Sequence, residues 1–185
     1  MLKKGAMFGL DARIALAIFG ALSVISGAAL YSAITQAKVV SLVTQFQEYA
    51  KAREQFMLDT GQDLSLVGSR NLRSIELITE TGTGWKGPYL SQEGYSVDYL
   101  ESGTYDQWMF VAAPKTPAWN VPTDLTPTCV ANPNEACHIW VHMIGVTESL
   151  NQQIDEYIDG SVDAQNGDYR WRSNATYYNV GLKVE

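Results

Sequence analysis

The two cysteines, Cys129 and Cys137, have the spacing of a disulfide. They close the segment CVANPNEAC, and its central Asn-Pro-Asn is typical of a turn. Two cysteines that close a short loop in an oxidising compartment favour a disulfide over a redox or metal-binding pair. We therefore predict a Cys129–Cys137 bond, with two free thiols as the alternative.

Two histidines, His138 and His142, invite comparison with a metal site. They lie in HIWVHMIGV, a segment that predicts a β-strand. On a strand, residues four apart share a face but are separated by about 13 Å, at ~3.3 Å per residue. One ion cannot bridge that distance, so we expect both side chains to be surface or interface residues.

An acidic run, IDEYIDGSVDAQNGDYR at residues 154–170, holds the third set of candidates. Calcium takes six to eight oxygen ligands, which carboxylates and backbone carbonyls of a tight loop can supply. Asp159, Asp163 and Asp168 are therefore candidate calcium ligands, although their spacing is not that of an EF-hand. The run fits equally a helix with a solvated acidic side and a polar turn after it, and we favour this second interpretation.

The sequence lacks the common catalytic motifs. It contains no G-x-S-x-G, phosphate loop, H-E-x-x-H or paired-cysteine zinc pattern. Its net charge of −7 argues against nucleic acid, because phosphate binding needs a basic face. We expect neither an enzyme nor a nucleic-acid-binding protein, and no cofactor.

One further carboxylate, Asp11, stands beside a long apolar segment. Residues 14–37 contain no charged side chain, and a helix of about 20 such residues crosses the ~30 Å hydrocarbon core of a bilayer. Asp11 could be the N-cap of that helix, accepting a hydrogen bond from a backbone N–H. Alternatively it needs a cationic partner, because a carboxylate drawn into a bilayer is costly.

Basic residues set the orientation of this segment. Lys3 and Lys4 precede it, and no equal cluster directly follows it. The positive-inside rule then keeps the N-terminus in the cytoplasm and sends the rest of the chain across the membrane. The cysteines therefore lie in an oxidising compartment, as the predicted disulfide requires.

Two simple interpretations of the N-terminus stay open: a secretory signal peptide cut near Ser26-Gly27-Ala28, and a plain single-pass anchor. Asp11 beside the apolar segment and a helical pattern that continues past the cut weaken the signal-peptide interpretation. Small residues four apart, Ser23 and Gly27, indicate an anchor that packs against other helices instead of a plain one. An apolar stripe at alternating steps of four and three predicts an amphipathic helix after the apolar segment. The stripe consists of Val39, Val43, Phe46, Ala50, Arg53 and Met57.

These N-terminal features occur together in one known family. With its short basic leader, an acidic residue shortly after a small one, and a helix first apolar and then amphipathic, the chain resembles the type IV pilins and type II secretion pseudopilins. In that family a prepilin peptidase cuts after a small residue, usually glycine, and the fifth mature residue is usually glutamate. A cut after Ala6 makes Met7 the first mature residue and Asp11 the fifth, whereas a cut after Gly5 makes Asp11 the sixth.

The remaining residues predict one small α+β domain. Thr60-Gly61 ends the long helix, and the five prolines of segment 114–133 make it a surface loop closed by the disulfide. A helix at 147–160 is expected to bury Ile154, Tyr157 and Ile158. The expected strands are a hairpin of 95–101 and 107–113, a strand at 138–146 and one or two strands within 169–185.

The motif GWKGPYL, residues 84–90, predicts a turn anchored by large side chains. Two glycines and a proline force the turn, while Trp85, Tyr89 and Leu90 supply apolar surface. An ordinary anchored loop explains these residues. The motif is also similar to a tryptophan, glycine, proline and tyrosine stretch that many pseudopilins carry between the long helix and the sheet.

The resemblance implies an α+β fold, the ladle of type IV pilins, in which the second half of the long helix packs on a small antiparallel sheet. It implies a leader at 1–6, a transmembrane and polymerisation helix at 7–60, and a globular head at 61–185 with the disulfide loop. It also raises the calcium interpretation, because some major pseudopilins bind calcium in their C-terminal loop.

The implied function is that of a structural subunit. The precursor is expected in a bacterial inner membrane as a single-pass protein with a cytoplasmic N-terminus. Its partners would be the prepilin peptidase, an inner-membrane assembly platform and further copies of itself, which form a periplasmic or extracellular filament. By resemblance, Asp11 pairs with the N-terminal amine of a neighbouring subunit. The alternatives are an uncleaved membrane-anchored binding domain and a minor pilin or adhesin at a filament tip.

Overall fold

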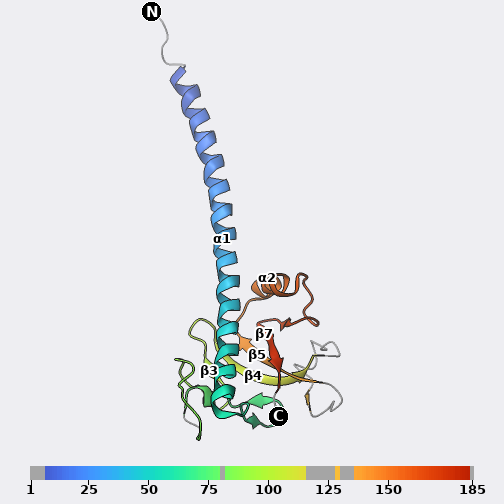
Figure 1. Cartoon of the computed structure of the whole chain (residues 1–185). Helices are drawn as coiled ribbons and strands as arrows, with labels where there is room; N and C mark the ends of the chain where they lie inside the picture. The colour runs from blue at the N-terminus through green and yellow to red at the C-terminus, as the bar shows by residue number, and fades with distance from the viewer. Residues whose placement is uncertain (1–6, 80–81, 116–127, 130–135, 184–185) are drawn as a thin grey trace, which may run out of the picture. The chain divides into compact units, whose positions relative to one another are not determined.

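The computed structural model describes residues 7–79, 82–115, 128–129 and 136–183, without the side chains of residues 7, 8 and 10. The chain divides into two compact units, residues 1–40 and 41–185, and we call the second the head unit. One helix, α1 (Met7–Thr60), runs through the boundary between them (Figure 1). The first unit holds the part of α1 that precedes Ser41.

Helix α1 ends where the sequence predicts. It contains no proline, and Gly61 adopts a left-handed φ of 72° directly after Thr60. The Gly61 N–H donates to the Met57 carbonyl at 2.8 Å, which satisfies one of the free carbonyls of the last turn. The Thr60 hydroxyl donates to the Phe56 carbonyl at 2.7 Å.

In the head unit, the described residues form a seven-stranded sheet in which every pair of neighbouring strands is antiparallel. Its order is β1-β2-β4-β5-β7-β6, and β3 also pairs with β4. The strands are β1 (Leu66–Val67), β2 (Asn71–Leu72), β3 (Leu100–Glu101), β4 (Gln107–Pro114), β5 (Cys137–Ile144), β6 (Tyr169–Arg172) and β7 (Ala175–Leu182). The eight-residue strands β4, β5 and β7 form its centre.

The head unit's part of α1 packs on one face of this sheet. Tyr49 of α1 stacks on Trp108 of β4 with ring centroids 3.6 Å apart and planes 6° from parallel. Phe46 lies one turn earlier and contacts Tyr178 of β7 at 5.3 Å and Tyr169 of β6 at 6.2 Å. The fold is therefore α+β, with a long N-terminal helix packed on a small antiparallel sheet, as predicted.

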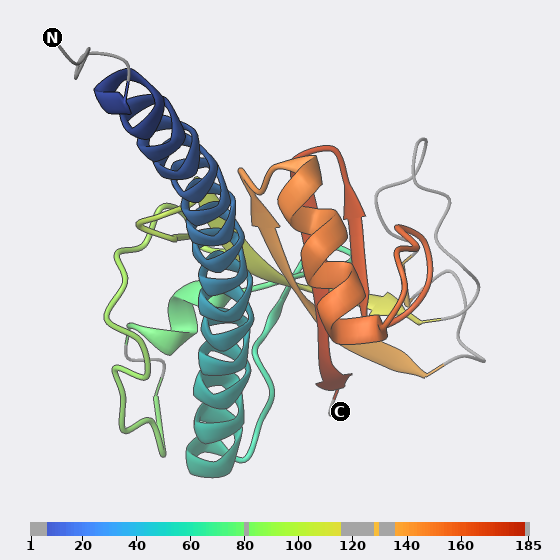
Figure 2. The same ribbon diagram turned by 90° about the horizontal axis from the view of Figure 1, so that it is seen from above.

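A second helix, α2 (Glu148–Asp159), covers the same face beside α1 (Figure 2). It begins after Thr147 and ends at Gly160, which has a φ of 74° and donates its N–H to the Glu156 carbonyl at 3.0 Å. Sequence periodicity predicts these ends correctly. The predicted inward face is wrong in part, because Tyr157 is 56% exposed while Asn151 and Asp155 are buried.

Hydrogen bonds explain why α2 buries polar residues. The Tyr169 hydroxyl donates to Asn151 Oδ1 at 2.7 Å, and the Asn151 amide donates to the carbonyls of Val146 and Ser173. The indole N–H of Trp171 donates to Asp155 Oδ2 at 3.0 Å. A polar group can be buried when such partners satisfy it.

For residues 65–81, after α1, the sequence predicts a loop with a short helix that has Leu72, Ile75 and Ile78 on one face. The structure has a short 3-10 helix there, η1 (Ser74–Leu77), in which Leu77 is fully buried, while Leu72 lies in β2. The Ser74 hydroxyl accepts a hydrogen bond from the Phe110 N–H at 3.2 Å. The hairpin of β3 and β4 is present, although β3 has two residues instead of seven. The C-terminal segment forms two paired strands, β6 and β7.

Candidate functional site

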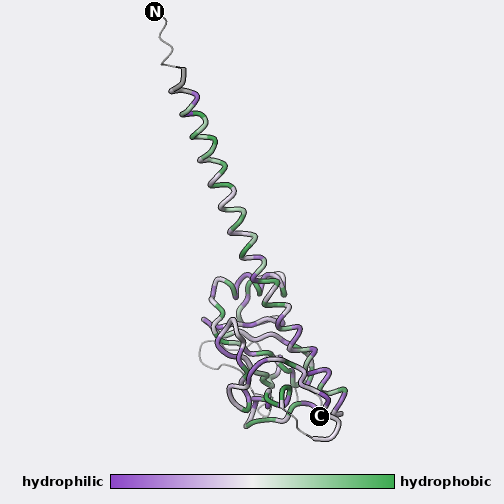
Figure 3. The backbone as a smooth tube through the Cα atoms, turned by 90° about the vertical axis from the view of Figure 1, so that its left-hand side faces the viewer, coloured by the Kyte–Doolittle hydropathy of each residue, from purple (hydrophilic) through white to green (hydrophobic). Residues whose placement is uncertain are grey.

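The apolar part of α1 is exposed along its length within its own unit. One described helix is long and apolar enough to cross a membrane, and its most apolar window has no residue buried in the molecule. Figure 3 shows this continuous hydrophobic stretch. The large apolar side chains left exposed are Ile14, Leu16, Ile18, Phe19, Leu22, Val24, Ile25, Leu30, Tyr31 and Ile34. Such a surface is stable in lipid or against other apolar helices, and not in water.

Asp11 lies inside α1 and is exposed. The helix begins at Met7, four residues earlier, so Asp11 is not the N-cap, and the capping interpretation of this residue is wrong. Its carboxylate therefore stands on the helix surface, next to the apolar segment. Met7 is the first helical residue, while the other two predicted cleavage residues, Gly5 and Ala6, lie outside the described residues.

The GWKGPYL turn is bonded to the last turn of α1. The Tyr89 hydroxyl and the Lys86 amine both donate to the Asp59 carboxylate, at 3.1 and 2.8 Å. The Tyr89 ring meets Phe56 edge-on at 5.9 Å, and the indole N–H of Trp85 donates to the Glu76 carbonyl at 2.9 Å. The Lys86 partner lowers the pKa of Asp59. The motif thus connects the end of α1 to residues 74–77 of the segment that follows the helix.

A buried ion pair holds the same end of α1. Arg53 donates to both carboxylate oxygens of Asp63, at 2.8 and 2.6 Å, and to the Leu182 carbonyl of β7 at 3.1 Å. The two side chains are only 6% and 4% exposed. Arg53 was expected on the buried stripe of the helix, but the sequence does not indicate which carboxylate pairs with it.

The predicted disulfide is present, joining Cys129 to Cys137 with their Cα atoms 5.5 Å apart. Cys137 is the first residue of β5, so the bond attaches Cys129 of the Pro-rich segment to the sheet. Most of that segment, including residues 116–127 and 130–135, lies outside the described residues. Among the described cysteines none is free.

The two histidines have different surroundings. His142 is 7% exposed, stacks on Tyr177 at 4.4 Å and has Nδ1 3.2 Å from the Thr176 carbonyl. Burial lowers its pKa to about 4, so it is neutral at physiological pH. The expectation of a surface position is wrong for His142. His138 is half-buried, with Nδ1 3.2 Å from Asn179 Oδ1.

The candidate calcium ligands each accept hydrogen bonds from the protein itself. Asp159 accepts from the N–H groups of Asp168 and Tyr169, at 3.0 and 2.9 Å, and Asp163 accepts from the Gln165 N–H and the Asn166 amide. Asp168 accepts from Lys115 and Asn179. In the described part of the chain no group of three or more His, Cys, Asp or Glu side chains could hold a metal ion.

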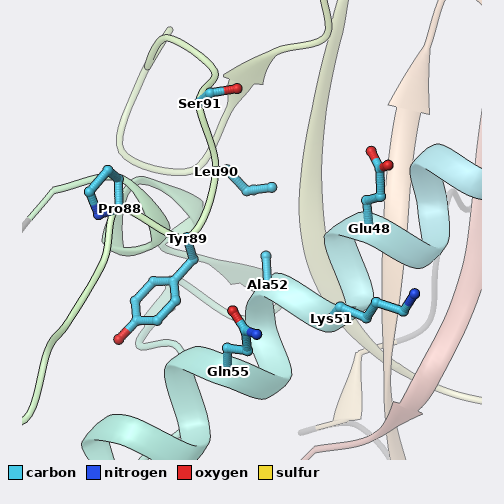
Figure 4. Close-up of a pocket in the computed structure, with 8 residues that line it drawn as sticks. All are labelled: Glu48, Lys51, Ala52, Gln55, Pro88, Tyr89, Leu90 and Ser91. Atoms are coloured by element: carbon cyan, nitrogen blue, oxygen red, sulfur yellow. The ribbon is translucent and has the colours of Figure 1, made fainter.

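A shallow groove lies between α1 and the end of the GWKGPYL turn (Figure 4). Its volume is about 480 Å³. It is lined by Glu48, Lys51, Ala52, Gln55, Pro88, Tyr89, Leu90 and Ser91. Charged side chains occur on the helix side only, which suits a polar chain segment better than a buried small molecule.

Comparison with known proteins gives no match for this chain among family models, curated proteins or solved structures. Two features of the chain bear most directly on its function. One is the exposed apolar part of α1, which carries the Asp11 carboxylate, and the other is the head unit, which is built on the continuation of the same helix.

Proposed function

We propose that this chain is a structural subunit of a type IV pilus or a type II secretion pseudopilus. In this proposal the precursor waits in the inner membrane, a prepilin peptidase removes the leader, and the mature chains polymerise through their N-terminal helices. The observation that carries the proposal is the part of α1 in the first unit. Its apolar side chains are exposed, and it continues as one helix into the head unit.

Asp11 supplies the specificity of assembly. Transfer of a carboxylate toward the centre of a bilayer costs about 2.5 to 3.5 kcal/mol on insertion scales, so an acidic residue there needs a partner. Cleavage of the leader creates one, because a new α-amino group is largely cationic at neutral pH. Attraction between the two charges is much stronger in a water-poor helix bundle than in bulk water. A pair between Asp11 of one subunit and the amine of the next then sets the axial register.

The test is a charge-neutral substitution at Asp11, measured as filament yield per cell by electron microscopy and shearing. Asp11→Asn removes the charge and keeps the size, so we expect membrane insertion and helix content to stay normal while filament yield falls at least about tenfold, the effect of 1.4 kcal/mol per contact. Asp11→Glu keeps the charge and should preserve most of the yield. Arg13→Gln, two residues away, is the matched control for loss of a neighbouring charge.

Normal filaments from Asp11→Asn would contradict this role for the carboxylate. The proposal as a whole has a separate test, which is the mass of the mature N-terminus. We expect the chain to begin at Ala6 or Met7 in assembled material. A chain that retains Met1 would favour the second candidate, an uncleaved membrane-anchored binding domain, for which the groove beside Lys51 and Tyr89 is the feature that would bind a partner.

A further inference from the structure

A lysine amine and an asparagine amide meet at one carboxylate oxygen in the head unit. Asp168 Oδ1 accepts a hydrogen bond from Lys115 Nζ at 2.5 Å and another from Asn179 Nδ2 at 2.6 Å. Because both nitrogens share one acceptor atom, they lie within two hydrogen-bond lengths of each other. Lys115 follows β4, Asn179 lies in β7 and Asp168 directly precedes β6.

The register of the sheet puts this cluster on the face opposite α1. Asn179 pairs with Trp140, and His138 pairs with Ala113, whereas the residues that meet α1 occupy the alternate positions. Neither α1 nor α2 covers these side chains, because both helices pack on the other face. The cluster is thus separate from the elements on which the proposed polymerisation rests.

The oxygen of the Asn179 amide is held by two further groups. The Gly181 N–H donates to Asn179 Oδ1 at 3.1 Å, and His138 Nδ1 lies 3.2 Å from the same atom. A carboxylate only accepts and a backbone N–H only donates, so these neighbours fix which end of the amide is oxygen. Donation by His138 requires the proton on Nδ1. Two donors at this position stabilise negative charge that develops on the oxygen when the amide carbon is attacked.

We propose that Lys115 and Asn179 form an intramolecular isopeptide bond, with Asp168 carrying protons between them. Lys115 transfers one proton to the Asp168 carboxylate, and the neutral amine attacks Cγ of Asn179 to form the new C–N bond. Charge collects on Oδ1, where His138 and Gly181 stabilise it. Asp168 returns its proton to Nδ2, the C–Nδ2 bond breaks, and the nitrogen takes the second lysine proton and leaves as ammonium. No oxidant, metal or co-reactant is consumed.

Solvent access affects the rate of this reaction. The side chains of Lys115 and Asp168 are 37% and 45% exposed, which gives ammonium a path out of the site. The same exposure and the ion pair with Asp168 favour the charged form of the amine, which does not attack. Bond formation is therefore slow and occurs once per chain after folding. It would join β4 to β7 covalently across β5, which lies between them.

The test is mass spectrometry of the full chain, purified in detergent and sampled over days. We expect the intact mass to fall by one ammonia per chain, and digestion to release a branched peptide in which Lys115 is linked to Asn179. The branched peptide is the decisive signal, because succinimide formation at the exposed Asn166, which precedes Gly167, also releases ammonia. Loss of ammonia mapped only to Asn166, or a wild-type chain that keeps its full mass, would overturn the proposal.

Three variants identify the groups involved. Lys115→Arg keeps the cation beside Asp168 but removes the nucleophilic amine, and Asp168→Asn removes the proton carrier, so both should fail to give the branched peptide. Circular dichroism of each variant shows whether it is folded. If Asp168→Asn does not fold, the conservative Lys115→Arg variant still tests the proposal. Lys86→Arg changes a different ion pair, with Asp59, that does not include Asn179, and it should cross-link like the wild type. A branched peptide in Lys115→Arg would contradict the assigned nucleophile.

Discussion

At the scale of single residues, Arg53 shows how the head unit accommodates a charge in its core. Burying an ion pair costs desolvation energy for both partners, which is recovered only when the geometry is good and the remaining donors are satisfied. Arg53 has this geometry, since Nε and Nη2 make two bonds to Asp63 and Nη2 makes a third to the Leu182 carbonyl. Its long side chain thereby connects α1, the segment after it and the end of β7.

We expect Arg53→Met to reduce the free energy of unfolding by about 3 to 5 kcal/mol, because it leaves the Asp63 carboxylate buried without its cation. Urea unfolding of the head unit measures this loss. Met has a similar length and apolar stem, so lost packing is a small part of the effect. The double variant Arg53→Met, Asp63→Leu removes both charges and should recover most of the stability. Equal stability of the single and double variants would contradict this account.

Asp155 gives a prediction about pH. Burial raises the pKa of this carboxyl above its usual 3.8, and Oδ1 is a buried atom with no hydrogen-bond partner. A raised pKa in the folded state means that the folded chain binds the proton more tightly than the unfolded chain. The contribution of Asp155 to stability is therefore complete below pH 3.8 and is lost as the pH rises through the folded value.

The matched variant is Asp155→Asn, which keeps an acceptor for the N–H groups of Trp171 and Asp163 but does not titrate. Relative to wild type, we expect it to be less stable at pH 3 than at pH 7, measured as the difference in free energy of unfolding at each pH. Asp155→Ala should instead lose about 1 to 3 kcal/mol at pH 7, because both donors are left unpaired. A wild-type to Asn difference that does not change with pH would refute the assignment.

At the scale of residues, the sequence indicates local features such as burial or a short disulfide loop better than it indicates ion-pair partners. Arg53 was expected on the buried side of the helix, and Cys129 with Cys137 as a bond, because periodicity and a short loop are local patterns. The partners of Arg53 and Lys115, namely Asp63 and Asp168, are 10 and 53 positions away in the chain. Only the packed sheet brings them together, and no spacing rule in one sequence indicates it.

At the scale of elements, the GWKGPYL turn is fitted closely to the end of α1. Gly84 has a φ of 90°, and a Cβ atom there would lie 2.5 Å from the Asp59 carbonyl oxygen. A side chain at this position therefore meets helix backbone, which cannot yield as the tip of a flexible side chain would. The glycine is needed for close approach as well as for its backbone conformation.

We expect Gly84→Ala to cost at least about 1 to 3 kcal/mol, the usual penalty for a strained backbone position, and to weaken the contact of Tyr89 with Phe56. Thermal unfolding of the head unit measures the loss. Gly103→Ala is the control, because Gly103 also has a positive φ, of 75°, but no atom lies within 4 Å of the added Cβ. If the two variants are equally destabilised, backbone conformation alone explains the effect and the close contact is irrelevant.

Element boundaries were predictable where a local signal marks them. Gly61 and Gly160 end their helices as the sequence indicates, because each takes the left-handed conformation that stops a helix. Helix faces were less predictable. In α1 four residues of the predicted stripe are buried, namely Val39, Val43, Phe46 and Arg53. Ala50 and Met57 are only half-buried, and Leu42, Tyr49 and Phe56 beside the stripe are buried as well. In α2, Tyr157 is exposed because hydrogen-bonded Asn151 and Asp155 occupy the buried side, and hydrophobicity alone does not reveal this.

At the scale of the whole molecule, the two units place different demands on their surroundings. The first unit exposes large apolar side chains such as Phe19 and Val24, each more than 70% exposed. The head unit has its own core, with Trp108, Phe110 and Trp140 fully buried. The exposed apolar surface of the first unit must be covered by lipid or other helices, whereas the apolar core of the head unit is already buried.

We therefore expect a fragment that begins at Lys38 to be a soluble, folded monomer. It retains the amphipathic part of α1, the sheet and the disulfide, and it lacks the apolar residues that require a membrane. Sedimentation without detergent should give one monomeric species, with cooperative thermal unfolding and the near-ultraviolet dichroism of packed aromatic side chains. The full chain in detergent is the control for native structure, and the same fragment should form no filaments. The expectation is contradicted if the fragment aggregates or lacks fixed tertiary structure while the full chain folds in detergent. The head unit would then depend on the apolar part of α1 for its own stability, and membrane residence and folding would not be divided between the two units.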